Sequence, residues 1–108
     1  MNFIFSDGIF LFNLSRVAHG VNISLKDLAA LLELSTHYFC HLFKQSTGIA
    51  PYQYVIQQRV TKAQKMLKLQ DSSLVDIALE CGFVNQSAFN RTFKKHVGTT
   101  PKRYRRGL

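Results

Sequence analysis

The feature that most constrains the fold of this chain is an internal repeat, in which the second half restates the pattern of the first. Of the 108 residues, those from Ser24 to Tyr54 recur from Ser73 to Tyr104 at an offset of 49, which becomes 50 after one extra residue in the second turn. Apolar positions can match by chance, but caps and stops in the same register indicate a duplicated structural unit. The matched residues are Ser24, Leu25, Asp27, Leu28, Ala29, Leu34, Phe39, Phe43, Lys44, Gly48, Pro51 and Tyr54 in the first copy, and Ser73, Leu74, Asp76, Ile77, Ala78, Phe83, Phe89, Phe93, Lys94, Gly98, Pro101 and Tyr104 in the second.

Each copy predicts a short helix, a tight turn and a second helix, which together form a helix-turn-helix unit. Ser24 and Asp27 have the spacing of a capping box, with aspartate in place of the usual glutamate. The second copy has Gly82 in its turn, where a left-handed backbone costs glycine least, whereas the first copy has Glu33. A non-glycine residue in that conformation costs on the order of 1 kcal/mol. The first turn is therefore expected to differ in detail or to be less stable.

The spacing of apolar residues predicts helices along most of the chain. A first helix is expected over about residues 9–19, and a long one over residues 51–69, which begins with Pro51 and contains no glycine or further proline. The long helix spans roughly 28 Å at 1.5 Å per residue. The predicted fold class is all-α, with about seven helices in a single domain over residues 1–108. That domain comprises an N-terminal helix-turn-helix unit over about residues 9–50, a linker helix over about 51–69 and a C-terminal helix-turn-helix unit over about 72–106.

The aromatic residues of the repeat are expected in the core, because their helical spacing accounts for them without a role as stacking platforms. This set is Phe39, Phe43, Phe83, Phe89, Phe93 and Tyr104, together with Leu42. The remaining face of each second helix is therefore free for recognition.

The positive charge of the chain is concentrated in its second half. Residues 1–50 contain three basic and three acidic residues, whereas residues 51–108 contain eleven basic and three acidic residues. The net charge of +8 therefore comes entirely from the second half. Such an excess favours a polyanionic partner, either nucleic acid or an anionic membrane surface, over a generic solubilising charge.

Cysteine usage and the N-terminal residues indicate the compartment. Cys40 and Cys81 lie far apart without a CxxC pair, which favours a reducing compartment over a disulfide framework or a structural zinc site. The apolar segment over residues 3–14 is interrupted by Asp7 and Gly8 and lacks a basic leader. Neither a membrane-spanning helix nor a secretory signal is expected there, so a cytoplasmic location is predicted.

The second half also contains a recognisable family signature. The run Asp76-Ile-Ala-Leu-Glu-Cys-Gly-Phe83 is followed by Ser87-x-Phe89-x-Arg91-x-Phe93-Lys-Lys95, Gly98-x-x-Pro101 and Tyr104-Arg105. This pattern resembles the DNA-binding domain of the AraC/XylS family of bacterial transcription regulators, over about residues 22–106. The resemblance implies two helix-turn-helix units joined by a long helix, each unit placing its second helix in a major groove of double-stranded DNA.

The resemblance places the first recognition helix over residues 35–46, with histidines on its exposed side. His37 and His41 lie one turn apart, where they can meet bases or phosphates, serve as ordinary surface residues, or share a metal. No third ligand accompanies them, so no metal site and no cofactor are predicted. The expected DNA-binding residues of this unit are Ser35, Thr36, His37, Cys40, His41 and Lys44.

The second recognition helix has amides and an arginine at its start, the end that usually meets the bases. Arg91 can contact a base or a phosphate, or form an ion pair with Glu80 of the preceding helix. Lysines near the helix end are expected to bind phosphates, and the C-terminal cluster from Lys102 to Arg106 either binds the DNA backbone or forms a solvated tail. The expected DNA-binding residues are Asn85, Gln86, Ser87, Asn90, Arg91, Lys94, Lys95 and Lys102.

Three alternatives to sequence-specific binding have less support. A DNA-alkylation repair fragment would use a reactive cysteine, for which Cys40 beside two histidines is the candidate. A non-specific nucleic-acid binder would use the charge alone. A basic amphipathic membrane binder is disfavoured, because the aromatic residues repeat in register with turns and caps. No catalytic set has a convincing context, so no enzyme activity is predicted.

The expected partner is double-stranded promoter or operator DNA in the bacterial nucleoid. RNA polymerase is a further expected partner of an activator, and no membrane partner is expected. Family members commonly have a separate effector-binding or dimerisation domain ahead of this one. The chain is therefore expected to be either a small stand-alone activator or the C-terminal domain of a larger regulator.

Overall fold

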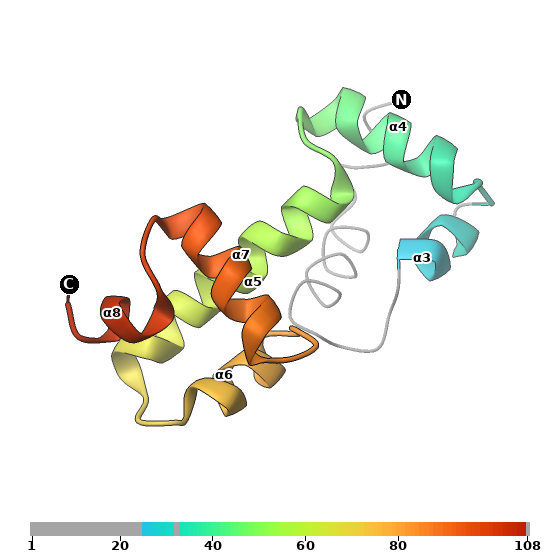
Figure 1. The fold of residues 1–108 in the computed structure, drawn as a ribbon. Coiled ribbons are helices and arrows are strands. Elements are labelled where there is room, and N and C mark those ends of the chain that lie inside the picture. Colours follow the sequence, from blue (N-terminus) through green and yellow to red (C-terminus); the bar gives the residue numbers. More distant parts are fainter. Residues whose placement is uncertain (1–24, 32, 108) are drawn as a thin grey trace. The chain divides into compact units, whose positions relative to one another are not determined.

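The computed structural model describes residues 25–31 and 33–107, and all regular structure within them is helical (Figure 1). The predicted all-α class is confirmed. The helix expected over residues 9–19 and the predicted cap Ser24 lie outside the described residues. The helices are α3 (Leu25–Leu31), α4 (Thr36–Thr47), α5 (Pro51–Leu69), α6 (Leu74–Glu80), α7 (Gln86–Val97) and α8 (Pro101–Arg105).

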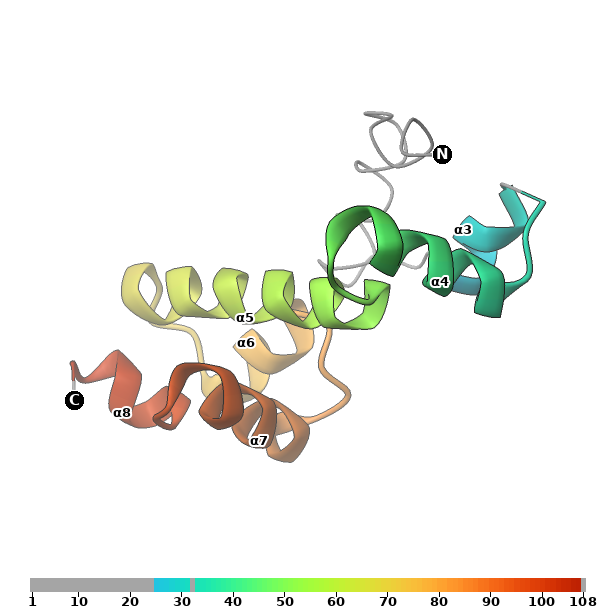
Figure 2. The ribbon, with the colours of Figure 1, turned by 90° about the horizontal axis from the view of Figure 1, so that it is seen from above.

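The chain divides into two compact units, the first ending at Ile56 and the second beginning at Gln57. The boundary falls within α5, so the long helix contributes its first turns to one unit and its remainder to the other. Figure 2 shows α5 as one uninterrupted helix, as the absence of internal glycine and proline predicts. Among the described helices, none is both long and apolar enough to cross a lipid bilayer.

The repeated caps and stops of the sequence produce the same helix ends in both units. Ser35 begins α4, where its side-chain oxygen accepts a hydrogen bond of 3.1 Å from a backbone N–H, and Asn85 begins α7 in the same way at 2.8 Å. Gly48 and Gly98 end these helices in left-handed conformations, with φ of 86° and 94°. Both α4 and α7 are therefore fixed at their two ends by local interactions.

The turn of the first unit has the same hydrogen bonds as the turn of the second. Glu33 adopts φ of 57° and Gly82 adopts φ of 92°, so a non-glycine residue does occupy the left-handed conformation. The expectation that the first turn differs in detail is wrong, and lower stability remains the prediction. The matching backbone bonds are Leu34 N to Ala29 O (3.0 Å) and Glu33 N to Ala30 O (3.0 Å) in the first unit, and Phe83 N to Ala78 O (3.0 Å) and Gly82 N to Leu79 O (3.1 Å) in the second.

Each unit has its own aromatic core. In the first unit Phe39 and Phe43 are buried, and the ring of Phe43 meets that of Tyr54 edge-on at 6.2 Å. In the second unit four rings form a chain, with centroid separations of 5.1, 5.6 and 5.4 Å, through Phe83, Phe89, Phe93 and Tyr104. The core assignment from helical spacing is confirmed, except that Tyr104 at the end of this chain is half-buried. Because each core packs against the inner face of α4 or α7, the opposite face of each helix is exposed.

Candidate nucleic-acid interface

The exposed side of α7 presents a polar and basic surface. Ser87, Arg91, Lys94 and Lys95 are exposed, opposite the buried Phe89. They recur at spacings of three and four residues, so they share one face of the helix. We call these four residues the α7 reading face. It contains hydroxyl, guanidinium and ammonium donors and no carboxylate, which suits bases and phosphates.

Two of the residues expected to face outward lie at the edge of this surface. Gln86 and Asn90 are half-buried, and the Oδ1 atom of Asn90 is fully buried and has no hydrogen-bond partner among the described residues. On a helical wheel both lie closer to the core side than Arg91 does. The fully outward placement expected for these two residues is therefore wrong, and their contact with DNA stays a prediction.

Asn85 combines a structural role with its predicted one. Its Oδ1 atom accepts the N–H of Ala88 at 2.8 Å, which caps α7. The capped oxygen is less available to a base, but the amide NH₂ of Asn85 remains free to donate. Asn85 is exposed, so this donor group is accessible to a ligand at the start of the helix.

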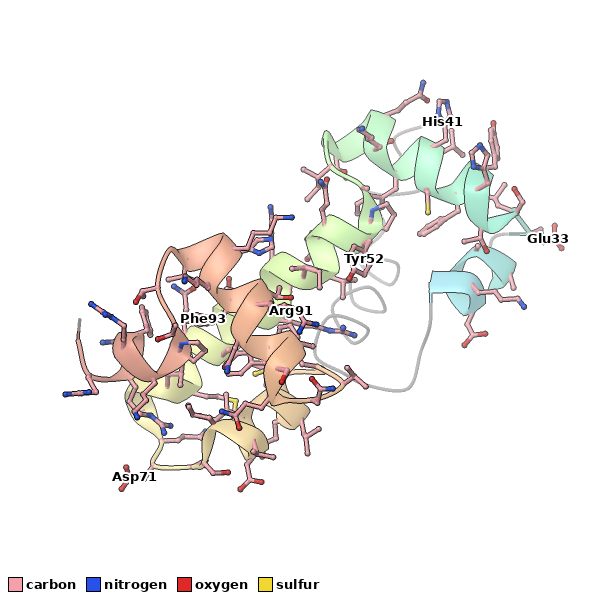
Figure 3. The ribbon with its side chains drawn as sticks, in the orientation of Figure 1. Glu33, His41, Tyr52, Asp71, Arg91 and Phe93 are labelled. Atoms are coloured by element: carbon pink, nitrogen blue, oxygen red, sulfur yellow. The ribbon has the colours of Figure 1, made fainter. Side chains whose placement is uncertain are left out.

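The corresponding surface of α4 has histidines where α7 has serine and arginine. Thr36, His37, His41 and Lys44 are exposed, and Figure 3 shows the ring of His41 on the outer side of α4. The expected outward residue Cys40 is half-buried, because it occupies the position of Asn90 in the other unit. Ser35 is exposed and caps the helix.

Tyr38 is a candidate that sequence reasoning missed. Its side chain is 46% exposed, and its ring is stacked on that of His41 with centroids 6.4 Å apart. The available signal was that position 38 falls off the apolar stripe of α4. A solvent-exposed aromatic ring beside a histidine can pack on a sugar or a thymine methyl group.

The histidine pair does not belong to a larger ligand set. Among the described residues, no group of three or more histidine, cysteine, aspartate or glutamate side chains is placed to hold a metal ion. His37 and His41 alone supply two ligands, fewer than the three or four protein ligands of a zinc site.

Three cations of the second unit bind the carbonyl ends of helices. Lys62 Nζ donates to Glu80 O at 3.2 Å, at the end of α6, and Lys68 Nζ donates to Tyr104 O at 2.9 Å, near the end of α8. Arg105 donates to two carbonyls at the end of α5, Leu67 O at 3.3 Å and Gln70 O at 3.0 Å. Cations are stabilising at helix C-termini. Arg105, which was expected either at the DNA backbone or in a solvated tail, therefore binds carbonyl groups of the protein instead.

Other basic side chains of the second unit remain accessible to an anion. The carboxylate of Glu80 has no ion pair with Arg91, so that structural alternative for Arg91 is not observed. Lys102 is exposed at the first turn of α8, and Arg103 and Arg106 are exposed beside it. The position equivalent to Lys102 in the first unit is Tyr52, which is 65% exposed.

The buried cysteine is a packing residue. Burial, with a smaller contribution from Glu80, raises the pKa of Cys81 to about 11 against the opposing effects of Lys62 and Arg59. Its Sγ atom lies 3.6 Å from Met66 Sδ. A raised pKa keeps the group a neutral thiol at pH 7, whereas nucleophilic cysteines have lowered pKa values. The chemistry of a reactive cysteine is therefore not supported at this position.

Known proteins are similar to this chain over most of its length, across both units. A family model described as a helix-turn-helix domain matches residues 28–107. The probable transcription factor PqrA of Proteus vulgaris is 37% identical over 84% of this chain and 75% of its own length. The probable transcriptional regulator LumQ of Photobacterium leiognathi is 35% identical over 76% of this chain and 33% of its own. This chain matches only about a third of the length of LumQ and of two other curated relatives.

Solved structures share the fold over most of their length. The C-terminal domain of the response regulator yesN from Fusobacterium nucleatum has a TM-score of 0.83 at 30% identity, covering 90% of this chain and 94% of that one. The DNA-binding domain of AdpA, solved with a target DNA, has a TM-score of 0.79 at 31% identity, covering 92% and 87%. A regulator from Chromobacterium violaceum, described as having an AraC-type DNA-binding domain, has a TM-score of 0.75 at 29% identity, covering 90% and 87%.

Three findings indicate the same kind of domain. They are the family match, the similarity to known regulators, and the two helix-turn-helix units whose second helices are capped at both ends. The chain belongs to the AraC/XylS family of transcription regulators, as a helix-turn-helix domain of that family.

Proposed function

We propose that this chain binds double-stranded DNA in a sequence-specific manner and regulates transcription, with α4 and α7 as its two recognition helices. The observation that supports this most directly is the occurrence of the same capped helix twice, each time with its inner face buried and a polar outer face. The related AdpA domain was solved in complex with a target DNA. The net charge of +8 favours association with phosphates.

The two recognition helices would read different bases. The α7 reading face has Arg91, which can bond a guanine in bidentate fashion, whereas α4 has His37 and His41 at equivalent positions. Because the two helices differ, the preferred site need not be palindromic. We further propose that the two helices occupy successive major-groove segments, whose faces lie about 34 Å apart. The 19 residues of α5 span roughly 28 Å, a length compatible with that spacing once helix widths are added.

The proposal extends to the setting in which the domain acts. Regulation of transcription implies contact, direct or indirect, with RNA polymerase, and a cytoplasmic location at the nucleoid. The curated relatives of greater length have further regions, which in this proposal correspond to an effector-binding or dimerisation domain.

Selection of bound duplexes from a random pool at physiological salt tests this function. Two short preferred blocks about one helical turn apart are expected, since each recognition helix reads one groove segment. Recovery of sequences without enrichment, at an affinity that depends only on salt, would instead identify a non-specific binder.

A further inference from the structure

A small basic cup lies at the junction of α7 and α8. Its volume is about 450 Å³, and its lining consists of the last turn of α7, the linking residues and the first turn of α8. The lining residues are Lys94, Gly98, Thr99, Thr100 and Arg103, which we call the α7–α8 cup. It contains two cations and two hydroxyl groups, and no carboxylate.

Local backbone interactions shape this cup. Gly98 ends α7 with φ of 94° and donates its N–H to Lys94 O at 2.8 Å, which turns the chain sharply. Thr100 then begins α8, where its Oγ1 atom accepts the N–H of Arg103 at 3.2 Å. The two cationic side chains are thereby brought to the same hollow from two different helices.

The polar groups of the cup are available to a ligand. Lys94 and Arg103 are exposed, and within the described part of the chain their side chains and that of Thr99 make no hydrogen bond. The Thr100 hydroxyl accepts one bond and keeps its hydrogen free to donate. Ammonium, guanidinium and hydroxyl donors around one hollow suit an oxyanion with several acceptor oxygens, and the arginine can bind a phosphate in bidentate fashion.

The helix that bears Arg103 is held firmly in place. Lys68 donates to Tyr104 O at 2.9 Å and lies 4.6 Å from the centre of the Tyr104 ring, while Arg105 binds the end of α5. The same tyrosine packs edge-on against Phe93 of α7 at 5.4 Å. These contacts order α8 relative to α7 before any ligand arrives, which lowers the entropic cost of binding.

The cup also continues the surface that would face DNA. Lys94 belongs to the α7 reading face, one helical turn beyond Arg91. A phosphate bound at the cup would therefore flank the groove segment that α7 reads. We propose that the α7–α8 cup binds a single phosphate of the DNA backbone, an inference that rests on the proposed function.

The first unit lacks three of the five residues that line the cup. The repeat places Lys44 and Gly48 at the positions of Lys94 and Gly98, but Ile49, Ala50 and Gln53 replace the two threonines and the arginine. Instead of binding an anion, Gln53 Oε1 accepts the N–H of Ala50 at 3.2 Å. The phosphate site thus distinguishes the second unit from the first, so only the second unit binds a backbone phosphate at this position.

Replacing Arg103 with the residue of the first unit tests this proposal. Arg103→Gln is compared with Arg106→Gln, which removes the same charge from an exposed residue outside the cup. Binding to a selected duplex is measured by fluorescence anisotropy between about 50 and 200 mM salt. Arg103→Gln is expected to weaken binding on the order of tenfold and to reduce the salt slope by about 0.9, whereas Arg106→Gln is expected to change the slope little. Equal effects of the two variants would overturn the cup as a specific site.

A scan of neutral methylphosphonates along both strands identifies the phosphate. At one position, neutralising the phosphate is expected to weaken DNA binding by the wild-type protein but not by the Arg103→Gln variant, because that variant already lacks the arginine that binds this phosphate. If no position shows this non-additivity, the cup binds no DNA phosphate. A titration with inorganic phosphate is followed through the amide signals of Thr99 and Thr100. Tight binding of inorganic phosphate, together with additive effects in the methylphosphonate scan, would reassign the cup to a free anion. Absence of duplex binding by the wild-type protein would contradict the proposed function itself, and thermal melting confirms that each variant is folded.

Discussion

At the scale of single residues, Glu33 shows that local strain is tolerated where a turn is duplicated. It adopts φ of 57° and makes the same backbone hydrogen bonds as Gly82, which adopts 92°. The conformation costs a residue with a Cβ atom roughly 1–2 kcal/mol more than it costs glycine. The first turn therefore keeps its shape at the expense of stability.

Glu33→Gly is expected to stabilise the first unit by about 1 kcal/mol, after allowance for the greater chain entropy of glycine in the unfolded state. Denaturant unfolding measures the change. Gly82→Ala is the matched control and is expected to destabilise the protein by about the same amount, because it introduces the same strain in the second turn. A destabilising Glu33→Gly would show that the glutamate side chain contributes more than the strain costs.

Arg91 is the residue of the α7 reading face best suited to distinguish bases. Arg91→Ala is expected to weaken DNA binding by about 1–3 kcal/mol and to relax the preference at one base position. Lys102→Ala is the comparison. It is expected to weaken binding to all DNA sequences alike and to flatten the salt dependence of that binding by about one in slope. Binding isotherms on a set of single-base variants of the selected duplex measure both effects. Unchanged affinity and preference in Arg91→Ala would remove its recognition role.

At the scale of elements, the second unit is held together by cations at the ends of its helices. Arg105 binds carbonyls at the end of α5, and Lys68 of α5 binds a carbonyl near the end of α8. The two helices therefore stabilise each other's unsatisfied termini. This arrangement explains why three of the eleven basic residues of the second half are not free for DNA.

Arg105→Ala is expected to lower the free energy of unfolding by about 1–2 kcal/mol, because two carbonyl bonds at a helix end are lost. Arg103→Ala removes an exposed arginine of the same helix that makes no hydrogen bond among the described residues, and it is expected to change stability by less than about 0.5 kcal/mol. Thermal denaturation of both variants in the same buffer makes the comparison. Equal stabilities would indicate that the Arg105 bonds contribute nothing net in solution.

The α7–α8 cup can be transferred to the copy that lacks it. Ala50→Thr combined with Gln53→Arg restores the hydroxyl and the cation in the first unit, with Lys44 already present. The double variant is expected to bind DNA more tightly and to show a salt slope steeper by about 0.9, since one more phosphate is neutralised. Ala50→Thr alone adds no charge and is the control. A slope unchanged by the arginine would show that the first unit does not meet the backbone at this position.

At the scale of the whole molecule, the net charge lies in the second unit and its adjoining part of α5, while the described residues of the first unit carry few charges. The second unit would then supply most of the electrostatic attraction, and the first unit would contribute through its histidines and Tyr38. A protein with two such unlike units is suited to asymmetric sites.

Hydroxyl-radical footprinting at saturating protein is expected to show protection over about two helical turns of DNA, with stronger protection on the side bound by α7. The cleavage pattern of the Arg91→Ala variant is expected to lose protection on that side first. Protection confined to one groove segment, even at saturation, would contradict the proposal that both recognition helices bind.

Much of the fold and part of the site could be predicted from the sequence. Helices, caps and turns depend on residues within five positions of each other, such as Ser35 with Tyr38 or Gly98 with Lys94, so their signals are local and repeat in both copies. The same periodicity separates the buried face of α7 from its reading face.

What only the tertiary structure decided is which polar residues are available on those faces. Asn90 and Cys40 lie on the side of the helix that packing partly covers, so their exposure depends on neighbouring helices. Lys62, Lys68 and Arg105 bind carbonyls 18 to 38 residues away in the chain.

The sequence by itself determined two helix-turn-helix units and their basic second half, because those follow from short-range stereochemistry and composition. Folding decided which cations stabilise helix ends and which are left for an anion, because that depends on distances between elements far apart in the chain.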